Sequence, residues 1–216
     1  MGRLTYRDVE ELRADWRQRR PTIERRLADF RRVGGGTDED LFQELAFCLF
    51  AIQTSARRSD DAVRGLAANG LLWRGTAREI ASVLRRQVRF HNHKAAYLVA
   101  ARGRFLGDEP LRLWLAASPP KELRGRLVDE VDGFGYKEAS HFLRNVGRGE
   151  DFAILDRHIL RNLHRHGVIR GVPEALPARR YLAIEERVRE FSRAVRIPMA
   201  AIDLVFWSRA TGEVFK

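Results

Sequence analysis

Residues 131–156 read VDGFGYKEASHFLRNVGRGEDFAILD, and this stretch decides the fold and the chemistry expected of the chain. A very short turn, Gly133-Phe134-Gly135, separates two segments with helical spacing. Glycine permits positive φ in such a turn and leaves backbone N–H groups uncovered at the start of the next helix, where they can hold a phosphate. The pattern predicts a helical hairpin that binds a DNA backbone without reading its bases.

Two side chains of this stretch form a candidate reactive pair. Lys137 lies in the first turn of the second helix, where the positive end of the helix dipole disfavours an ammonium and favours a neutral, nucleophilic amine. Asp156 directly precedes the helical segment RHILRNLHRHG, at a position suited to capping that helix with an ionised carboxylate. A surface lysine and a simple capping aspartate would give the same pattern, so the pair by itself leaves a purely structural role open.

The surrounding sequence predicts an all-α fold, because apolar residues recur at helical spacing and no alternating strand pattern is convincing. Residues 41–52 leave hardly any polar face, which predicts a central buried helix. Capping boxes are predicted at Thr37 with Asp40 and at Thr76 with Glu79. Further helices are predicted over residues 60–68, 77–86, 93–106, 119–131, 136–146, 157–166, 178–195 and 199–210.

Composition limits the class of protein and its partners. The 216 residues are 44% hydrophobic and 32% charged, as in a soluble globular protein of one or two small domains. The net charge of +11 favours a polyanionic partner, although charge alone does not separate DNA from RNA or a membrane surface. No apolar stretch approaches the roughly twenty residues of a membrane helix, and no signal region opens the chain, so a cytoplasmic location is expected. Three consecutive glycines, residues 34–36, predict a flexible joint.

Lysine is rare in this chain, and its positions are informative. Of 40 basic residues, only Lys94, Lys121, Lys137 and Lys216 are lysine. Arginine stays protonated and cannot act as an amine nucleophile, whereas a lysine can lose its proton in a suitable environment. A GC-rich genome that replaced lysine by arginine elsewhere gives the same composition, and both explanations can hold together.

Several segments together resemble a known family. The hairpin followed by lysine and then aspartate is similar to the helix-hairpin-helix DNA glycosylases. More narrowly, the chain resembles the 8-oxoguanine DNA glycosylase/lyase branch described mainly from archaea and some bacteria. This narrower resemblance rests on the segments GFGYKEASHFLRN, AILDRHILRNL, VRFHNHKAAYL and DLVFWSRATGEVFK. It runs from about Leu41 to Lys216, and residues 1–36 carry no recognised motif.

The resemblance implies an all-α helix-hairpin-helix glycosylase fold with two helical lobes and the active cleft between them. Residues 1–55 would form the N-terminal part of the terminal lobe, and residues 56–148 the central lobe that ends in the hairpin. Residues 149–216 would complete the terminal lobe, with the catalytic aspartate and the base pocket.

The resemblance also implies chemistry. Lys137 would attack C1′ of the damaged nucleotide, expel the base and form a Schiff base that permits β-elimination of the 3′ phosphate. Asp156 would orient or deprotonate the amine and stabilise positive charge on the sugar. The pocket for the extruded base would be formed by Trp207, Lys216, Phe90 and Asp203. Trp207 and Phe90 could equally be core aromatics, and Lys216 a frayed end.

Contacts to DNA are expected outside this pocket. In related glycosylases a polar residue at the end of the buried helix enters the hole left in the duplex, and Gln53 matches it, although a helix-capping glutamine is an equal alternative. The hairpin residues Gly133, Phe134 and Gly135 would hold the backbone. Candidates for phosphate contacts, each of them also explained as a solvated charge, are His93, Lys94, Arg144, Arg148 and Arg157.

No metal and no organic cofactor are expected. Paired histidines stand two residues apart, which places them on different helix faces, and the single Cys48 cannot supply the four thiolates of an iron-sulfur cluster. The expected partner is double-stranded DNA that contains oxidised guanine, bound by a monomer associated with the nucleoid. Two alternatives stay open: a cluster-less glycosylase of endonuclease III type for oxidised pyrimidines, and a non-catalytic helix-hairpin-helix DNA-binding module.

Overall fold

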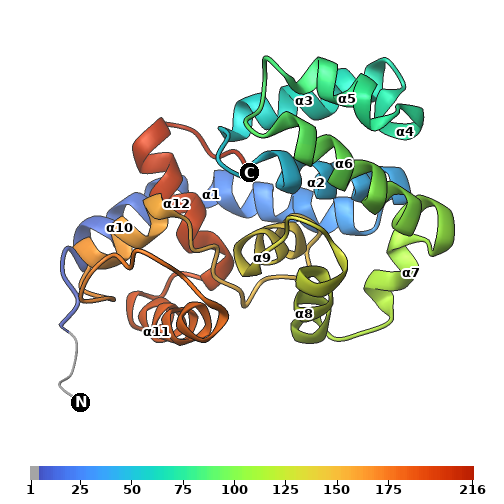
Figure 1. The fold of residues 1–216 in the computed structure, drawn as a ribbon. Coiled ribbons are helices and arrows are strands. Elements are labelled where there is room, and N and C mark those ends of the chain that lie inside the picture. Colours follow the sequence, from blue (N-terminus) through green and yellow to red (C-terminus); the bar gives the residue numbers. More distant parts are fainter. Residues whose placement is uncertain (1–4) are drawn as a thin grey trace.

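The computed structural model describes residues 5–216, and in this range the secondary structure is entirely helical, which confirms the all-α prediction (Figure 1). None of these helices is both long and apolar enough to cross a membrane. A π-helical turn, η1 (Gly103–Asp108), continues α6. The α-helices are α1 (Val9–Gly34), α2 (Asp38–Phe50), α3 (Ala56–Ala68), α4 (Leu71–Arg74), α5 (Ala77–Leu84), α6 (His91–Arg102), α7 (Leu111–Ala116), α8 (Pro120–Glu130), α9 (Tyr136–Asn145), α10 (Arg157–Arg165), α11 (Ala178–Val195) and α12 (Met199–Thr211).

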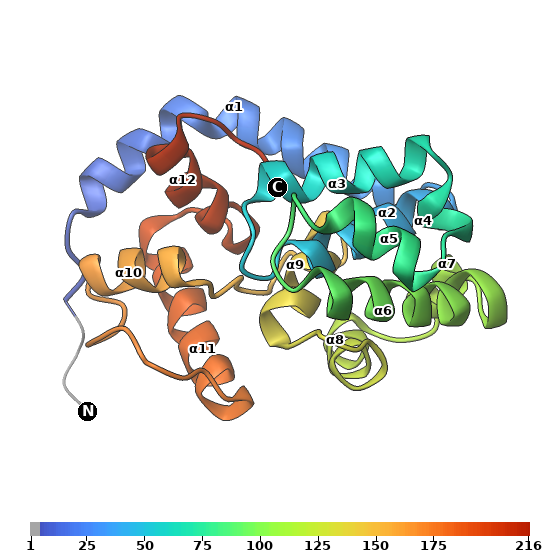
Figure 2. The same cartoon turned by 45° about the horizontal axis from the view of Figure 1, so that its top comes forward.

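Two hydrophobic clusters form the interior. The first cluster extends from Leu41 to Phe152 and takes in α2 to α9, whereas the second combines α1 with α10, α11 and α12. The chain therefore starts in one lobe, builds the other and returns (Figure 2). The side chains of α2 lie in the first cluster, so the expected boundary at residue 55 is wrong. The division falls instead at the glycines that separate α1 from α2.

Helix α2 has the burial that its composition predicts. Its residues from Leu45 to Phe50 are all fully buried, as are Leu41 and Phe42. The capping box at its start is confirmed, because the Asp40 N–H donates to Thr37 Oγ1 at 3.2 Å and the Thr37 N–H donates to Asp40 Oδ2 at 3.0 Å. The capping box of α5 is confirmed in the same way. A helix fixed at one end and buried on all sides gives the first lobe a rigid centre.

Helix α1 was not expected from sequence, and it spans both lobes (Figure 2). Its residue Phe30 is buried in the second cluster, and Val33, one turn later, packs against the first. Gly34 ends the helix, and a Cβ added there would lie 2.1 Å from the carbonyl oxygen of Val146. The expectation of a flexible joint is therefore wrong at Gly34, because this glycine allows a close approach between α1 and the end of α9.

The predicted hairpin joins α8 to α9. The Phe134 N–H donates to the Val131 carbonyl at 3.0 Å, and Gly133 has φ +85°. A Cβ on Gly133 would also lie 2.8 Å from the Tyr97 ring, so both conformation and space require glycine. The Phe134 side chain is buried in the first cluster, so the prediction that it contacts DNA is wrong for the side chain.

Candidate active site

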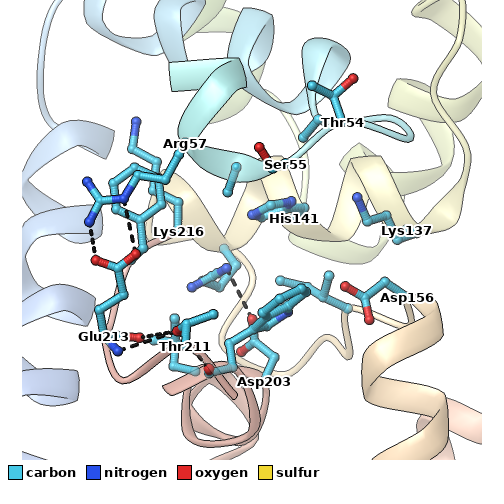
Figure 3. Close-up of a pocket in the computed structure, with 17 residues that line it drawn as sticks. Thr54, Ser55, Arg57, Lys137, His141, Asp156, Asp203, Thr211, Glu213 and Lys216 are labelled. Atoms are coloured by element: carbon cyan, nitrogen blue, oxygen red, sulfur yellow. Dashed lines mark hydrogen bonds and ion pairs between the residues drawn. The ribbon is translucent and has the colours of Figure 1, made fainter. Parts of the chain in front are cut away.

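A cavity opens between the two clusters and is lined by residues of both lobes (Figure 3). Helix α9 contributes Lys137 to it, and the N-terminus of α10 contributes Asp156. The two side chains face the same part of the cavity in Figure 3. The structure thus brings the predicted reactive pair together from opposite lobes. The remaining lining residues are Ala51, Thr54, Ser55, Ala56, Arg57, His141, Arg144, Ile154, Asp203, Leu204, Trp207, Thr211, Glu213, Phe215 and Lys216.

The Lys137 amine is accessible and weakly engaged. Lys137 is the second residue of α9 and is half-buried. Its Nζ lies 3.5 Å from Glu138 Oε1, and among residues 5–216 this is its one acidic partner. An amine whose lone pair is to attack carbon must not be saturated by hydrogen bonds, and this geometry meets that requirement.

Asp156 is fixed by the helix that follows it. Its Oδ1 accepts the Ile159 N–H at 2.7 Å and caps α10, as predicted. The other carboxylate oxygen remains available to the cavity. The bond to the Ile159 N–H fixes the orientation of the carboxylate at the start of α10, where the helix dipole favours negative charge.

Sequence reasoning missed His141, which lies one helical turn after Lys137. The residue is buried and lines the cavity, and neither ring nitrogen has a hydrogen-bond partner in the part of the chain that the structure describes. Burial lowers its pKa well below the usual value, and the nearby cations Arg144 and Lys137 act in the same direction. The ring is therefore neutral. Spacing of four residues from Lys137 was the available signal, since such residues share a helix face.

Two of the predicted base-pocket residues line the cavity from α12. The Trp207 ring packs against the His158 ring with centroids 4.5 Å apart and planes tilted by 31°, and it keeps part of its surface exposed. Asp203 is buried and pairs with Arg144 Nη2 at 3.1 Å. Burial raises the pKa of Asp203, while the Arg144 charge opposes that shift. Arg144 also lines the cavity, where its side chain is buried beside Asp203, and its contact with a phosphate stays a prediction.

Phe90 does not line the cavity, so its assignment to the base pocket is wrong. The side chain is 52% exposed, and the residue stands before α6 with φ +57°. Lys216, the fourth residue of the predicted pocket, does line the cavity, and its ammonium is held by Glu44 and Asp60.

The predicted phosphate contact of Lys94 is also wrong. Lys94 is 3% exposed, and its ammonium donates to the carbonyls of Phe50 at 2.7 Å and Ile52 at 2.6 Å and to Thr54 Oγ1 at 3.2 Å. These acceptors belong to the turn at the end of α2, so Lys94 caps that helix from outside. Burial lowers the pKa of Lys94 to about 8, and the charge of Lys137 contributes.

A basic groove adjoins the cavity where Thr54 and Ser55 line both. Gln53 lies in this groove, is exposed and has φ +52°. The groove also has four exposed arginines that sequence reasoning missed: Arg58, Arg85, Arg86 and Arg89. For the last three, the available signal was the arginine-rich segment RRQVR, residues 85–89. Of the other candidates for phosphate contacts, His93 and Arg157 are exposed. Arg148 is half-buried and donates to the Ser118 carbonyl at 3.1 Å.

These features define a helix-hairpin-helix DNA glycosylase. The chain has two helical lobes and a glycine hairpin before the helix that bears Lys137. The Asp156 carboxylate reaches the same cleft from the opposite lobe. The family model described as 8-oxoguanine DNA glycosylase matches residues 23–197.

Known proteins support this class. A protein of Fusobacterium nucleatum named 8-oxoguanine DNA glycosylase/AP lyase is 38% identical, over 98% of this chain and 97% of its own length. The crystal structure of the 8-oxoguanine DNA glycosylase of Thermotoga maritima is 36% identical, with a TM-score of 0.86 over 96% of this chain and 98% of that one. The Methanocaldococcus jannaschii glycosylase/lyase in complex with a 15mer DNA containing 8-oxoguanine is 31% identical, with a TM-score of 0.85 over 95% of this chain and all of that one. The chain belongs to the 8-oxoguanine DNA glycosylase family.

Proposed function

We propose that this protein removes 8-oxoguanine from duplex DNA and cleaves the strand at the resulting abasic site. The observation that carries the proposal is that Lys137 and Asp156, from different lobes, line one cavity between the lobes. A module that only bound phosphate would need the hairpin but not this pair. The names of the relatives support 8-oxoguanine as the substrate over the oxidised pyrimidines of the endonuclease III alternative.

The chemistry begins at the sugar. The Lys137 amine, in its deprotonated form, attacks C1′, the bond from C1′ to the base breaks, and the base leaves with the electron pair of that bond. The resulting secondary ammonium gives one proton to Asp156. The nitrogen lone pair then opens the bond from C1′ to the ring oxygen, which takes up a proton, and a protonated Schiff base results. Loss of a C2′ proton breaks the C3′–O bond and releases the 3′ phosphate, and water finally frees the lysine. Asp156 stabilises the positive charge that develops on the sugar and takes a proton from the amine.

The damaged nucleotide must leave the helical stack before Lys137 can reach C1′, and unstacking costs a few kcal/mol. The hairpin before α9 and the basic groove around Gln53 offset this cost through phosphate contacts. Inside the cavity, Trp207 offers an aromatic surface to the base, and the neutral His141 offers a donor and an acceptor. The expectation of a monomer stays a prediction.

The test is incubation with matched duplexes that carry one 8-oxoguanine, one thymine glycol or one guanine. Each product is scored with and without alkali, because alkali cleaves a strand that has lost only its base. We expect cleavage of the 8-oxoguanine duplex without alkali and little cleavage of the other two. Preference for the thymine glycol duplex would favour the endonuclease III alternative. Binding of the duplexes without cleavage of any of them would show that the protein is a DNA-binding module without glycosylase activity.

A further inference from the structure

Two buried acids converge on the last side chain of the sequence. Lys216 Nζ lies 2.6 Å from Glu44 Oε1 and 3.0 Å from Asp60 Oδ1. Glu44 belongs to α2 and Asp60 to α3, and both are more than nine-tenths buried. The Phe47 ring lies 4.7 Å from the same ammonium. Two carboxylates and an aromatic face form a binding site for one primary ammonium.

The acids have few other partners. The second oxygen of Glu44 accepts the Asn145 amide at 2.9 Å, and the second oxygen of Asp60 pairs with the exposed Arg64. A buried carboxylate without a countercharge is strongly unfavourable, so removing the ammonium would leave Glu44 in an unfavourable state. The two acids raise the pKa of Lys216 against the effect of burial, which keeps this amine charged.

The segment from Glu213 to Lys216 forms one wall of the cavity. It leaves α12 in the second lobe and docks on the first, where Glu213 pairs with Arg57 and the Arg57 guanidinium lies 4.6 Å from the Phe215 ring. Val214 packs against the second cluster and Phe215 against the first. The ammonium site therefore fixes the end of a segment that joins both lobes beside the cavity (Figure 3).

We propose that Glu44 and Asp60 are positioning residues that hold the Lys216 ammonium, so that residues 213–216 close the cavity around the damaged base. This inference rests on the proposed function, because it assigns the wall to base recognition. Excision of 8-oxoguanine needs the base enclosed between Trp207 and this wall. β-Elimination at a preformed abasic site does not need the wall, since no base occupies the cavity there.

The acids are tested with Glu44→Gln and Asp60→Asn, which keep shape and remove charge. Exposed acids of the same two helices give the matched controls Glu39→Gln and Asp61→Asn. Under single turnover we expect 8-oxoguanine excision to slow about tenfold in each test variant, because one charge-assisted hydrogen bond is lost. Cleavage of a preformed abasic site should stay within about twofold of the parent. Unchanged excision would overturn the inference, and so would an equal loss of both activities.

Lysine-selective NMR gives a second readout that does not depend on activity. The sequence has four lysines, so ¹³C-labelled lysine gives four resolvable side-chain signals, and Lys216→Met identifies one of them. The Lys216 signal should titrate at lower pH in Glu44→Gln than in the parent. An unchanged titration would show that the acids do not hold the ammonium. If the parent itself failed to excise 8-oxoguanine, the proposed substrate would be wrong, and the titration would still decide whether the acids bind Lys216.

Discussion

Two of the four lysines line the cavity and a third lies behind the turn that ends α2, and their amines have different partners. Lys94 donates hydrogen bonds to three oxygen acceptors of that turn, and Lys216 pairs with two carboxylates. Within residues 5–216, the one acidic partner of the Lys137 amine is Glu138, at 3.5 Å. The amine expected to react is therefore the one that the fold leaves without a close partner.

This comparison separates structural from chemical use of the same side chain. A primary ammonium that makes two or three short hydrogen bonds stabilises the helices around it and has no free lone pair. An amine with one distant partner contributes little to stability and can exchange its proton. The predictions below test whether these environments determine the roles, from the largest expected effect to the smallest.

Lys137→Gln should abolish the covalent complex with DNA, because no other amine in the cleft is free to attack C1′. The measurement is borohydride trapping of the protein on a duplex with one 8-oxoguanine. Lys121→Gln, at an exposed lysine, is the matched control and should trap like the parent. A crosslink that persists in Lys137→Gln would mean that a lysine with close partners can react after all.

Asp156→Asn should slow base excision by about 10²–10⁴-fold, since a neutral amide cannot take a proton from the amine or balance charge on the sugar. Asparagine is as good a helix cap as aspartate, so the melting temperature should change little. Single-turnover excision and a thermal melt on the same preparation separate these effects. A variant that melted far lower than the parent would show that the carboxylate serves mainly the helix.

Lys94→Met should destabilise the fold by about 1–3 kcal/mol, because three acceptors at the end of α2 lose their donor. Urea unfolding measures this change, with Lys121→Met as the control of equal chemistry at an exposed position. If Lys94→Met lost no more stability than Lys121→Met, Lys94 would not be a structural lysine.

The two structural lysines should also differ in the pH dependence of stability. The native pKa of Lys94, about 8, lies below its unfolded value, so the native state binds fewer protons between these values and is stabilised as pH rises through them. The pKa of Lys216 is raised in the native state. Its contribution to the free energy of unfolding is therefore fully present below the ordinary lysine pKa, and it is lost as pH rises through the native pKa. From pH 8 to pH 10 the stability difference between parent and Lys94→Met should therefore grow. The difference between parent and Lys216→Met should stay constant, and urea titrations at both pH values measure the two trends.

The parts of the fold that sequence predicted are those fixed by neighbouring residues. The boxes at Thr37 and Thr76 and the cap at Asp156 each involve residues three positions apart, so their pattern is visible in the chain itself. Helix α1 has no such capping pattern, and its buried residues Leu12, Trp16, Ile23 and Phe30 form a sparse helical face among many arginines. Helix α1 packs mainly on α12 and α9, far along the chain.

The site shows the same limit. Lys137 and Asp156 were found from the hairpin and a helix start, but the partners of Lys94 and Lys216 lie forty or more residues away and follow no local spacing. The sequence shows that a residue is charged without showing whether its charge is solvated or buried. Lys94 and Arg144 were therefore assigned to phosphate. Of the missed groove arginines, Arg58 of α3 meets the segment 85–89 only in the folded chain.

The continuous helix α1 has a consequence for how a duplex is engaged. Because α1 reaches from one lobe to the other, a hinge rotation that opened or closed the cleft would have to bend α1 or separate Gly34 from Val146. We therefore expect the cleft to keep a nearly constant width through the catalytic cycle. The distortion needed to bring a nucleotide to Lys137 must then fall on the nucleic acid, and base steps that bend easily should be processed faster than stiff ones.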